Sequence, residues 1–124
     1  MHPNELYLLF DPESRDGKST RAYAYSITPH VNENYYSSAQ MTSTFWRELL
    51  DMLDLTPKEI LNRAHPLYQA KIAGNAFDDE GWLNILKEYP YMIKAPIAIK
   101  ENRAIFCKTP TDILRLAKAT KTSE

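Results

Sequence analysis

The chain has 124 residues, of which 44% are hydrophobic and 25% charged, and its formal net charge is −1. This length and composition predict one globular domain, residues 1–124, and the near-neutral charge argues against nucleic-acid binding. The single cysteine, Cys107, excludes an internal disulfide, a CxxC pair and a multi-cysteine zinc site. The three histidines are too scattered for a metal-ligand pattern, so neither a metal nor another cofactor is predicted.

The amino-terminal segment predicts a soluble, cytoplasmic protein without membrane contact. Its apolar run, residues 6–10, is too short for a signal peptide or a membrane span, and no basic segment precedes it. The same run is continuously apolar and bounded by polar residues, which favours a central strand buried on both faces.

The elements that follow alternate between helix and strand patterns. Apolar spacing behind a capping residue predicts helices over residues 18–26, 45–53, 57–62, 78–89 and from 109 onwards. Ser14, Asp16 or Ser19 could cap the first of these helices, and Gly17 leaves its starting residue open. Short β-forming runs predict an edge strand at 31–36 and a hairpin of 96–99 with 104–107. Residues 65–66 and 71–76 predict a loop between the helices.

Several of these segments also carry a resemblance to a known family: residues 55–63, 78–80, 89–90, 93–99 and 104–108. Their order and separations resemble the glutaredoxin-coupled arsenate reductases and their relatives, the Spx-type transcription regulators. The resemblance implies an α/β, thioredoxin-like fold: a βαβ unit, a helical insertion at about 42–90, a β-hairpin and a carboxyl-terminal helix. It also implies a mixed four-stranded sheet with helices on its faces.

The resemblance marks Ser14 as the most informative position. The family has a nucleophilic cysteine two residues after an Asn-Pro pair and an arginine four residues later. Here the segment Asp11-Pro12-Glu13-Ser14 has Ser14 at the cysteine position, and Lys18 is at the arginine position. A serine hydroxyl neither ionises as a thiol does nor forms a disulfide. The resemblance therefore predicts that arsenate reduction through this position is lost.

The family's oxyanion-binding arginines are also altered. Their counterparts are Asn62, with Arg63 one residue away, Ala95 and Lys108. An alanine removes the bidentate contact that a guanidinium makes with an oxyanion, and a lysine does not replace it. What remains is a candidate anion-binding set, which consists of Ser14, Lys18, Arg63 and Lys108. By the same resemblance, the bond between Ala95 and Pro96 is predicted to be a structural cis-proline bond.

Three functions stay open on these observations. The leading hypothesis is a non-catalytic protein-interaction or regulatory module with an unknown protein partner, as in the Spx-type regulators, whose CxxC switch this chain lacks. The second is a divergent thiol-dependent oxidoreductase that uses Cys107 with Lys18, Arg63 and Lys108. The third is a protein that binds a small oxyanion. The alternating apolar pattern around Cys107 favours a small buried hydrophobic side chain, against a thiol that reaches the former active site.

The tyrosines are the last unusual feature. Six of the eight fall in two regions of the sequence: Tyr23, Tyr25, Tyr35 and Tyr36 in the first, Tyr89 and Tyr91 in the second. An exposed cluster of tyrosines would indicate a protein interface, whereas tyrosines at the margin of a core would be structural.

Overall fold

The computed structural model describes residues 5–36 and 41–117 of the chain. The chain divides into two compact units, of which unit 1 comprises residues 1–39 and 95–124 and unit 2 comprises residues 40–94. Unit 2 contains the helices predicted for the insertion, and the assignment of residues 1–124 to one domain stays a prediction. No helix in the described part of the chain is long and apolar enough to cross a membrane.

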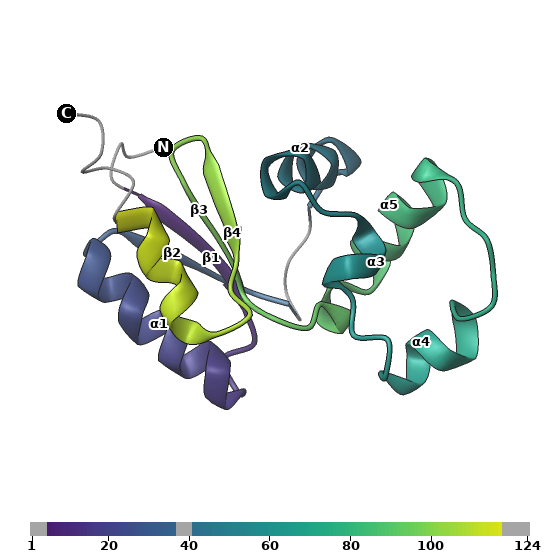
Figure 1. Ribbon diagram of the computed structural model, residues 1–124, viewed down its shortest axis with the longest axis horizontal. Helices are drawn as coiled ribbons and strands as arrows, with labels where there is room; N and C mark the ends of the chain where they lie inside the picture. Colours follow the sequence, from purple (N-terminus) through teal and green to yellow (C-terminus); the bar gives the residue numbers. More distant parts are fainter. Residues whose placement is uncertain (1–4, 37–40, 118–124) are drawn as a thin grey trace. The chain divides into compact units, whose positions relative to one another are not determined.

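Unit 1 is built on the predicted mixed four-stranded sheet, which is confirmed (Figure 1). Its strands are β1 (Leu6–Phe10), β2 (Val31–Tyr35), β3 (Ile97–Lys100) and β4 (Arg103–Phe106), in the order β2-β1-β3-β4. β1 is parallel to β2 and antiparallel to β3, and β3 is antiparallel to β4. β1 is thus the central strand and β2 an edge strand, as the apolar run and the Asn-rich segment predict.

Helix α1 (Arg15–Ile27) begins three residues earlier than the predicted residue 18. Ser14 is its N-cap, because the Ser14 hydroxyl accepts a hydrogen bond from the Gly17 amide over 2.9 Å. Gly17 is buried on the third residue of the helix, where a side chain would collide with the Asp11 carbonyl. Position 17 therefore requires a glycine, because the preceding loop comes too close for a side chain. This is the same glycine that leaves the first residue of the helix undecided in the sequence.

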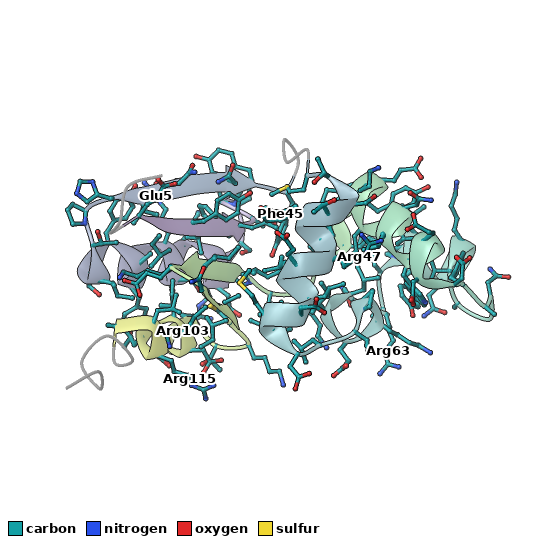
Figure 2. The ribbon with its side chains drawn as sticks, turned by 90° about the horizontal axis from the view of Figure 1, so that it is seen from above. Glu5, Phe45, Arg47, Arg63, Arg103 and Arg115 are labelled. Carbon is teal, nitrogen blue, oxygen red and sulfur yellow. The ribbon has the colours of Figure 1, made fainter. Side chains whose placement is uncertain are left out.

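One face of the sheet is covered by α1 and by the 3-10 helix η2 (Pro110–Leu114), the yellow segment of Figure 1. The core side chains of this layer come from β1, α1, β3, the residue after β4 and the carboxyl-terminal segment: Leu6, Leu8, Phe10, Ala24, Ala98, Cys107, Ile113 and Leu116. Figure 2 shows Arg103 beside this segment, and its guanidinium donates to the Leu116 carbonyl over 3.0 Å. Side chains from both ends of the chain thus form one hydrophobic layer.

The hairpin and the last helix differ slightly from their predicted bounds. Lys100 and Arg103 pair as strand residues, so the turn contains only Glu101 and Asn102. Glu101 has φ 59, the left-handed conformation that such a tight turn requires. The last helix begins at the predicted position, where Thr109 and Asp112 form a capping box, but its first turn is a 3-10 helix.

Unit 2 is helical, with α2 (Ser43–Leu53), α3 (Pro57–Ile60), α4 (Pro66–Lys71), α5 (Asp79–Glu88) and the 3-10 helix η1 (Pro90–Met92). The prediction of a capping residue before the helix is confirmed for α2 and α5, whose caps are Thr42 and Asp78. α3 is shorter than predicted and ends at Ile60, because Leu61 already has an extended conformation and pairs with Ile93.

Helix α4 replaces part of the predicted loop. His65 caps this helix through Nδ1, which accepts from the Leu67 amide over 3.1 Å, and Pro66 is its first residue. Of the predicted loop, Pro66 and Lys71 are helical, whereas residues 72–76 lie outside any helix. The start of α4 was missed because histidine is not among the residues that usually cap a helix, although proline at the first helical position is a regular start signal.

Candidate functional site

The strand register gathers the predicted site residues of unit 1 at one end of the sheet. Phe10 is paired with Tyr35, Leu9 with Ile97, and Ile97 with Phe106. The chain therefore leaves β1 and β4, and enters β3, at the same end. We call this end, formed by residues 11–14, 36, 95–96 and 107–108, the candidate edge.

The Ser14 hydroxyl at the candidate edge makes two main-chain contacts. It donates to the Asp11 carbonyl over 3.1 Å and accepts from the Gly17 amide over 2.9 Å. The Asp11 carboxylate is also used, since its Oδ1 accepts from the Glu13 amide over 2.9 Å. A main-chain carbonyl is no general base, so this arrangement orders the loop and caps α1 without activating the hydroxyl as a nucleophile.

Cys107 lies in the core layer of unit 1, with 1% of its surface exposed. Its amide donates to the Pro96 carbonyl over 2.8 Å, which extends the pairing of β3 and β4 by one step. Burial raises the pKa of the thiol to about 12, with a smaller contribution from the Asp112 carboxylate and an opposing one from Arg115. At neutral pH this cysteine is a protonated, apolar side chain.

Tyr36 is a residue of the candidate edge that the sequence analysis missed as a site residue. Its hydroxyl donates to the Ala95 carbonyl over 2.7 Å, between residues 59 positions apart in the sequence. Burial raises the pKa of this hydroxyl, and the neighbouring Asp11 carboxylate raises it further. The contact ties the end of β2 to the segment before β3. The only sequence signal was one more tyrosine in a tyrosine-rich region.

The bond between Ala95 and Pro96 is trans, because no peptide bond within residues 5–36 and 41–117 is cis. The predicted cis-proline is therefore wrong. The trans form of a bond to proline is favoured by about 0.5–1 kcal/mol unless the surroundings select the other isomer. In the trans form, the Ala95 and Pro96 carbonyls already accept from Tyr36 and Cys107.

Three of the four candidate anion-binding residues belong to unit 1. The Lys18 amide donates to the Ser14 carbonyl over 3.0 Å, so these two residues lie on the first turn of α1. Lys108 follows Cys107 at the candidate edge, and the side chains of Lys18 and Lys108 are exposed. Arg63 belongs to unit 2, on the exposed loop between α3 and α4 (Figure 2). In the part of the chain that the structure describes, no cluster of three His, Cys, Asp or Glu side chains could hold a metal ion.

Two tyrosines of the first region, Tyr25 and Tyr35, lie together on unit 1, because both of their hydroxyls donate to Glu33. They are 43% and 38% exposed, and we call them the tyrosine face. Tyr23 is 37% exposed but lies two positions before Tyr25 on α1, and residues at this spacing do not share a face of a helix. Glu33 of the edge strand accepts from the Tyr25 hydroxyl over 2.6 Å and from Arg21 Nε over 3.1 Å. The hydrogen bond from Tyr25 is the main reason that the pKa of Glu33 is lowered.

The second tyrosine region differs from the first. Tyr89 and Tyr91 of unit 2 have ring centroids 6.1 Å apart in an edge-to-face arrangement, and Tyr91 is 46% exposed. The first region is therefore split between a buried Tyr36 and an exposed face, whereas the second is a stacked pair of which one ring is exposed.

Comparison with known proteins gives matches at the level of structure. No protein-family model matches the sequence, and no curated protein sequence matches it either. An arsenate reductase from Vibrio cholerae superposes with a TM-score of 0.78 at 16% identity, over 92% of this chain and 98% of the other. A possible arsenate reductase from Streptococcus mutans superposes with a TM-score of 0.71 at 18% identity, over 90% and 98% of the two chains.

A third similar structure is an arsenate reductase related protein from Brucella melitensis, with a TM-score of 0.65 at 12% identity over 93% of this chain and 96% of the other. These matches cover nearly the whole of each solved chain. At such low identity they establish the fold, so the chain has the thioredoxin-like fold of the arsenate reductase structures.

Proposed function

We propose that this chain is an arsenate-reductase-like protein that has lost reductase catalysis and acts as a protein-interaction or regulatory module. One observation carries the proposal: the only cysteine of the sequence is 1% exposed and has its pKa raised to about 12. With that pKa, about one thiol in 10⁵ is ionised at pH 7. The thiolate is the nucleophile of thiol redox chemistry, so the chain lacks an accessible one.

The loop of the candidate edge supports the same proposal. The family's cysteine position is held by Ser14, whose hydroxyl is bonded to the Asp11 carbonyl and the Gly17 amide. One arginine position is held by Ala95, whose carbonyl accepts from Tyr36. The structural elements of the fold are retained there, while the groups that would attack and hold an oxyanion are replaced by groups that order the loop.

The tyrosine face supports the interaction part of the proposal. Tyrosine brings a large apolar ring and a polar hydroxyl at a low cost in side-chain entropy, and it is enriched in protein interfaces. The hydrogen bonds to Glu33 hold the ring of Tyr25, and Phe10 holds Tyr35 at a centroid distance of 5.5 Å. The face lies on α1 and the edge strand β2, so a protein partner could reach both.

The first test is a coupled reductase assay. NADPH oxidation is followed with arsenate, glutathione, glutaredoxin and glutathione reductase in excess, for the protein and for Cys107→Ser. We expect no turnover above the protein-free blank, because no exposed thiolate is present. Turnover in the unchanged protein would overturn the loss of catalysis, and its disappearance in Cys107→Ser would identify Cys107 as the nucleophile.

The second test concerns the tyrosine face. A photo-crosslinking p-benzoylphenylalanine replaces Tyr25 in one variant and Tyr91 in another, in cells that express the protein. Tyr91 is a matched control, because it is exposed to a similar extent but lies outside the face. We expect a discrete crosslinked product at position 25 that is absent at position 91. The same products at both positions, or none at 25, would contradict an interface on this face.

A further inference from the structure

Unit 2 has an open pocket of its own, with a volume of about 340 Å³. Its walls come from α3, the loop after it, α4 with the following turn, and α5. Aromatic rings and cations line it together: Tyr68 and Trp82 with Lys58 and Arg63. The volume is near the lower limit of ordinary small-molecule sites, which corresponds to a ligand of one or two rings.

The charged side chains that line the pocket, those of Lys58 and Arg63, are both positive. None of its lining residues is acidic. No hydrogen bond or ion pair is recorded for the Lys58 and Arg63 side chains within residues 5–36 and 41–117. Other arginines of the chain do have partners: Arg21 with Glu33, Arg47 with Glu80, and Arg115 with Asp112. The two pocket cations are therefore available to an anion from solution.

The walls of the pocket are fixed by hydrogen bonds that do not involve these cations. The Gln69 side-chain amide donates to the Arg63 carbonyl and so holds the loop to α4. The Tyr68 carbonyl accepts from the amides of Ile72 and Ala73 at the end of that helix. Gly74 then turns the chain with φ +81, a conformation that favours glycine. A wall that is already ordered lowers the entropy cost of binding.

The second aromatic element is also held in place. Trp82 packs edge-to-face against Phe77 at a centroid distance of 5.2 Å, and this contact holds a side chain that lines the pocket. Aromatic rings pair in offset-stacked or edge-to-face arrangements, and a guanidinium pairs with a carboxylate through two parallel hydrogen bonds.

We propose that this pocket binds a small aromatic carboxylate, with its ring against Trp82 and its carboxylate held by Lys58 and Arg63. A bare oxyanion would leave the apolar part of the lining without a contact, and a neutral ring would leave the two cations without a partner. The site lies within unit 2 and involves neither the candidate edge nor the tyrosine face, so it is independent of the proposed function.

The test follows chemical shifts of the ¹⁵N-labelled protein as 2-naphthoate is added. The reporters are the Gly74 amide and the Trp82 indole N–H, since both residues line the pocket. For a ligand of this size, ordinary ligand efficiency gives a Kd of about 1 mM. We expect saturable shifts in that range, and about tenfold weaker binding in Lys58→Met and Arg63→Met, because each removes a charged hydrogen-bond donor.

The matched control is Lys87→Met on α5, which removes the same charge from an exposed residue outside the pocket. It should bind 2-naphthoate as the unchanged protein does. Two further probes test the ring and the carboxylate separately. Neutral 2-naphthamide has the ring without the negative charge, and inorganic phosphate has the charge without the ring. Each should bind at least tenfold more weakly than 2-naphthoate. No saturable shift, equal binding of either probe, or an equal loss in Lys87→Met would overturn the proposal.

Discussion

Replacement of Gly17 by alanine is expected to lower the free energy of unfolding by about 1–3 kcal/mol, as overpacking of a tight site does. An ideal Cβ on Gly17 lies 2.1 Å from the Asp11 carbonyl oxygen and 2.7 Å from Ser14 Oγ. The first of these atoms is main chain, so the loop must shift to make room. Alanine's higher helix propensity offsets only about 1 kcal/mol of this cost. Urea unfolding curves of the two proteins measure the difference.

Gly81→Ala is the matched control for this prediction. Gly81 is also the third residue of its helix, α5, behind the capping side chain of Asp78. Its Cβ would come no closer than 3.1 Å to a neighbour, and the neighbours are side-chain atoms of Asp78 and Phe77 that can move. We expect a change within about 1 kcal/mol, since helix propensity and mild crowding oppose one another. If both variants lose the same stability, the close approach at Gly17 has no special role.

The substitution at Gly17 is also expected to affect the candidate edge. The Asp11 carbonyl that approaches Gly17 is the same atom to which Ser14 donates its hydroxyl proton. A side chain at position 17 would therefore disturb the loop that carries Ser14. Gly17 and Ser14 together keep this loop in a closed, capped conformation.

The second large effect is a loss of folding stability at alkaline pH, which we expect from the buried thiol of Cys107. Its pKa is raised from 9.0 to about 12 by burial, so the folded state holds the thiol proton more tightly than the unfolded state does. The stability from this group is fully present below about pH 9 and is lost as pH rises towards 12. At pH 10, which is one unit above the ordinary pKa of 9.0, the free energy of unfolding is lower by about 1.4 kcal/mol.

The measurement compares the protein with Cys107→Ala in urea at about pH 8 and at about pH 10. Tyr7, whose pKa burial raises to about 12, titrates in both proteins, so its contribution cancels in the comparison. We expect the unchanged protein to lose about 1.4 kcal/mol more than the variant over this interval. An equal loss in both, or rapid modification of the folded thiol by a disulfide reagent at about pH 8, would indicate an accessible thiolate and weaken the proposed loss of catalysis.

Local patterns in the sequence predicted the elements that depend on neighbouring residues. The apolar run Leu6–Phe10 forms the central strand, because a continuous run can be buried on both faces. The caps of α2 and α5 and the capping box of Thr109 are contacts within three residues, so the sequence alone is sufficient to place them. The absence of a cysteine at position 14 is likewise a fact of the sequence.

The tertiary structure decided what depends on contacts between distant residues. The bond from Tyr36 to the Ala95 carbonyl spans 59 positions, and no local pattern contains it. The raised pKa of Cys107 comes from the strands and helices around it, since desolvation depends on what packs around a group. The sequence by itself thus determined which chemical groups this protein has, and only the folded chain decided which of them reach solvent, because burial is set by segments far apart in the sequence.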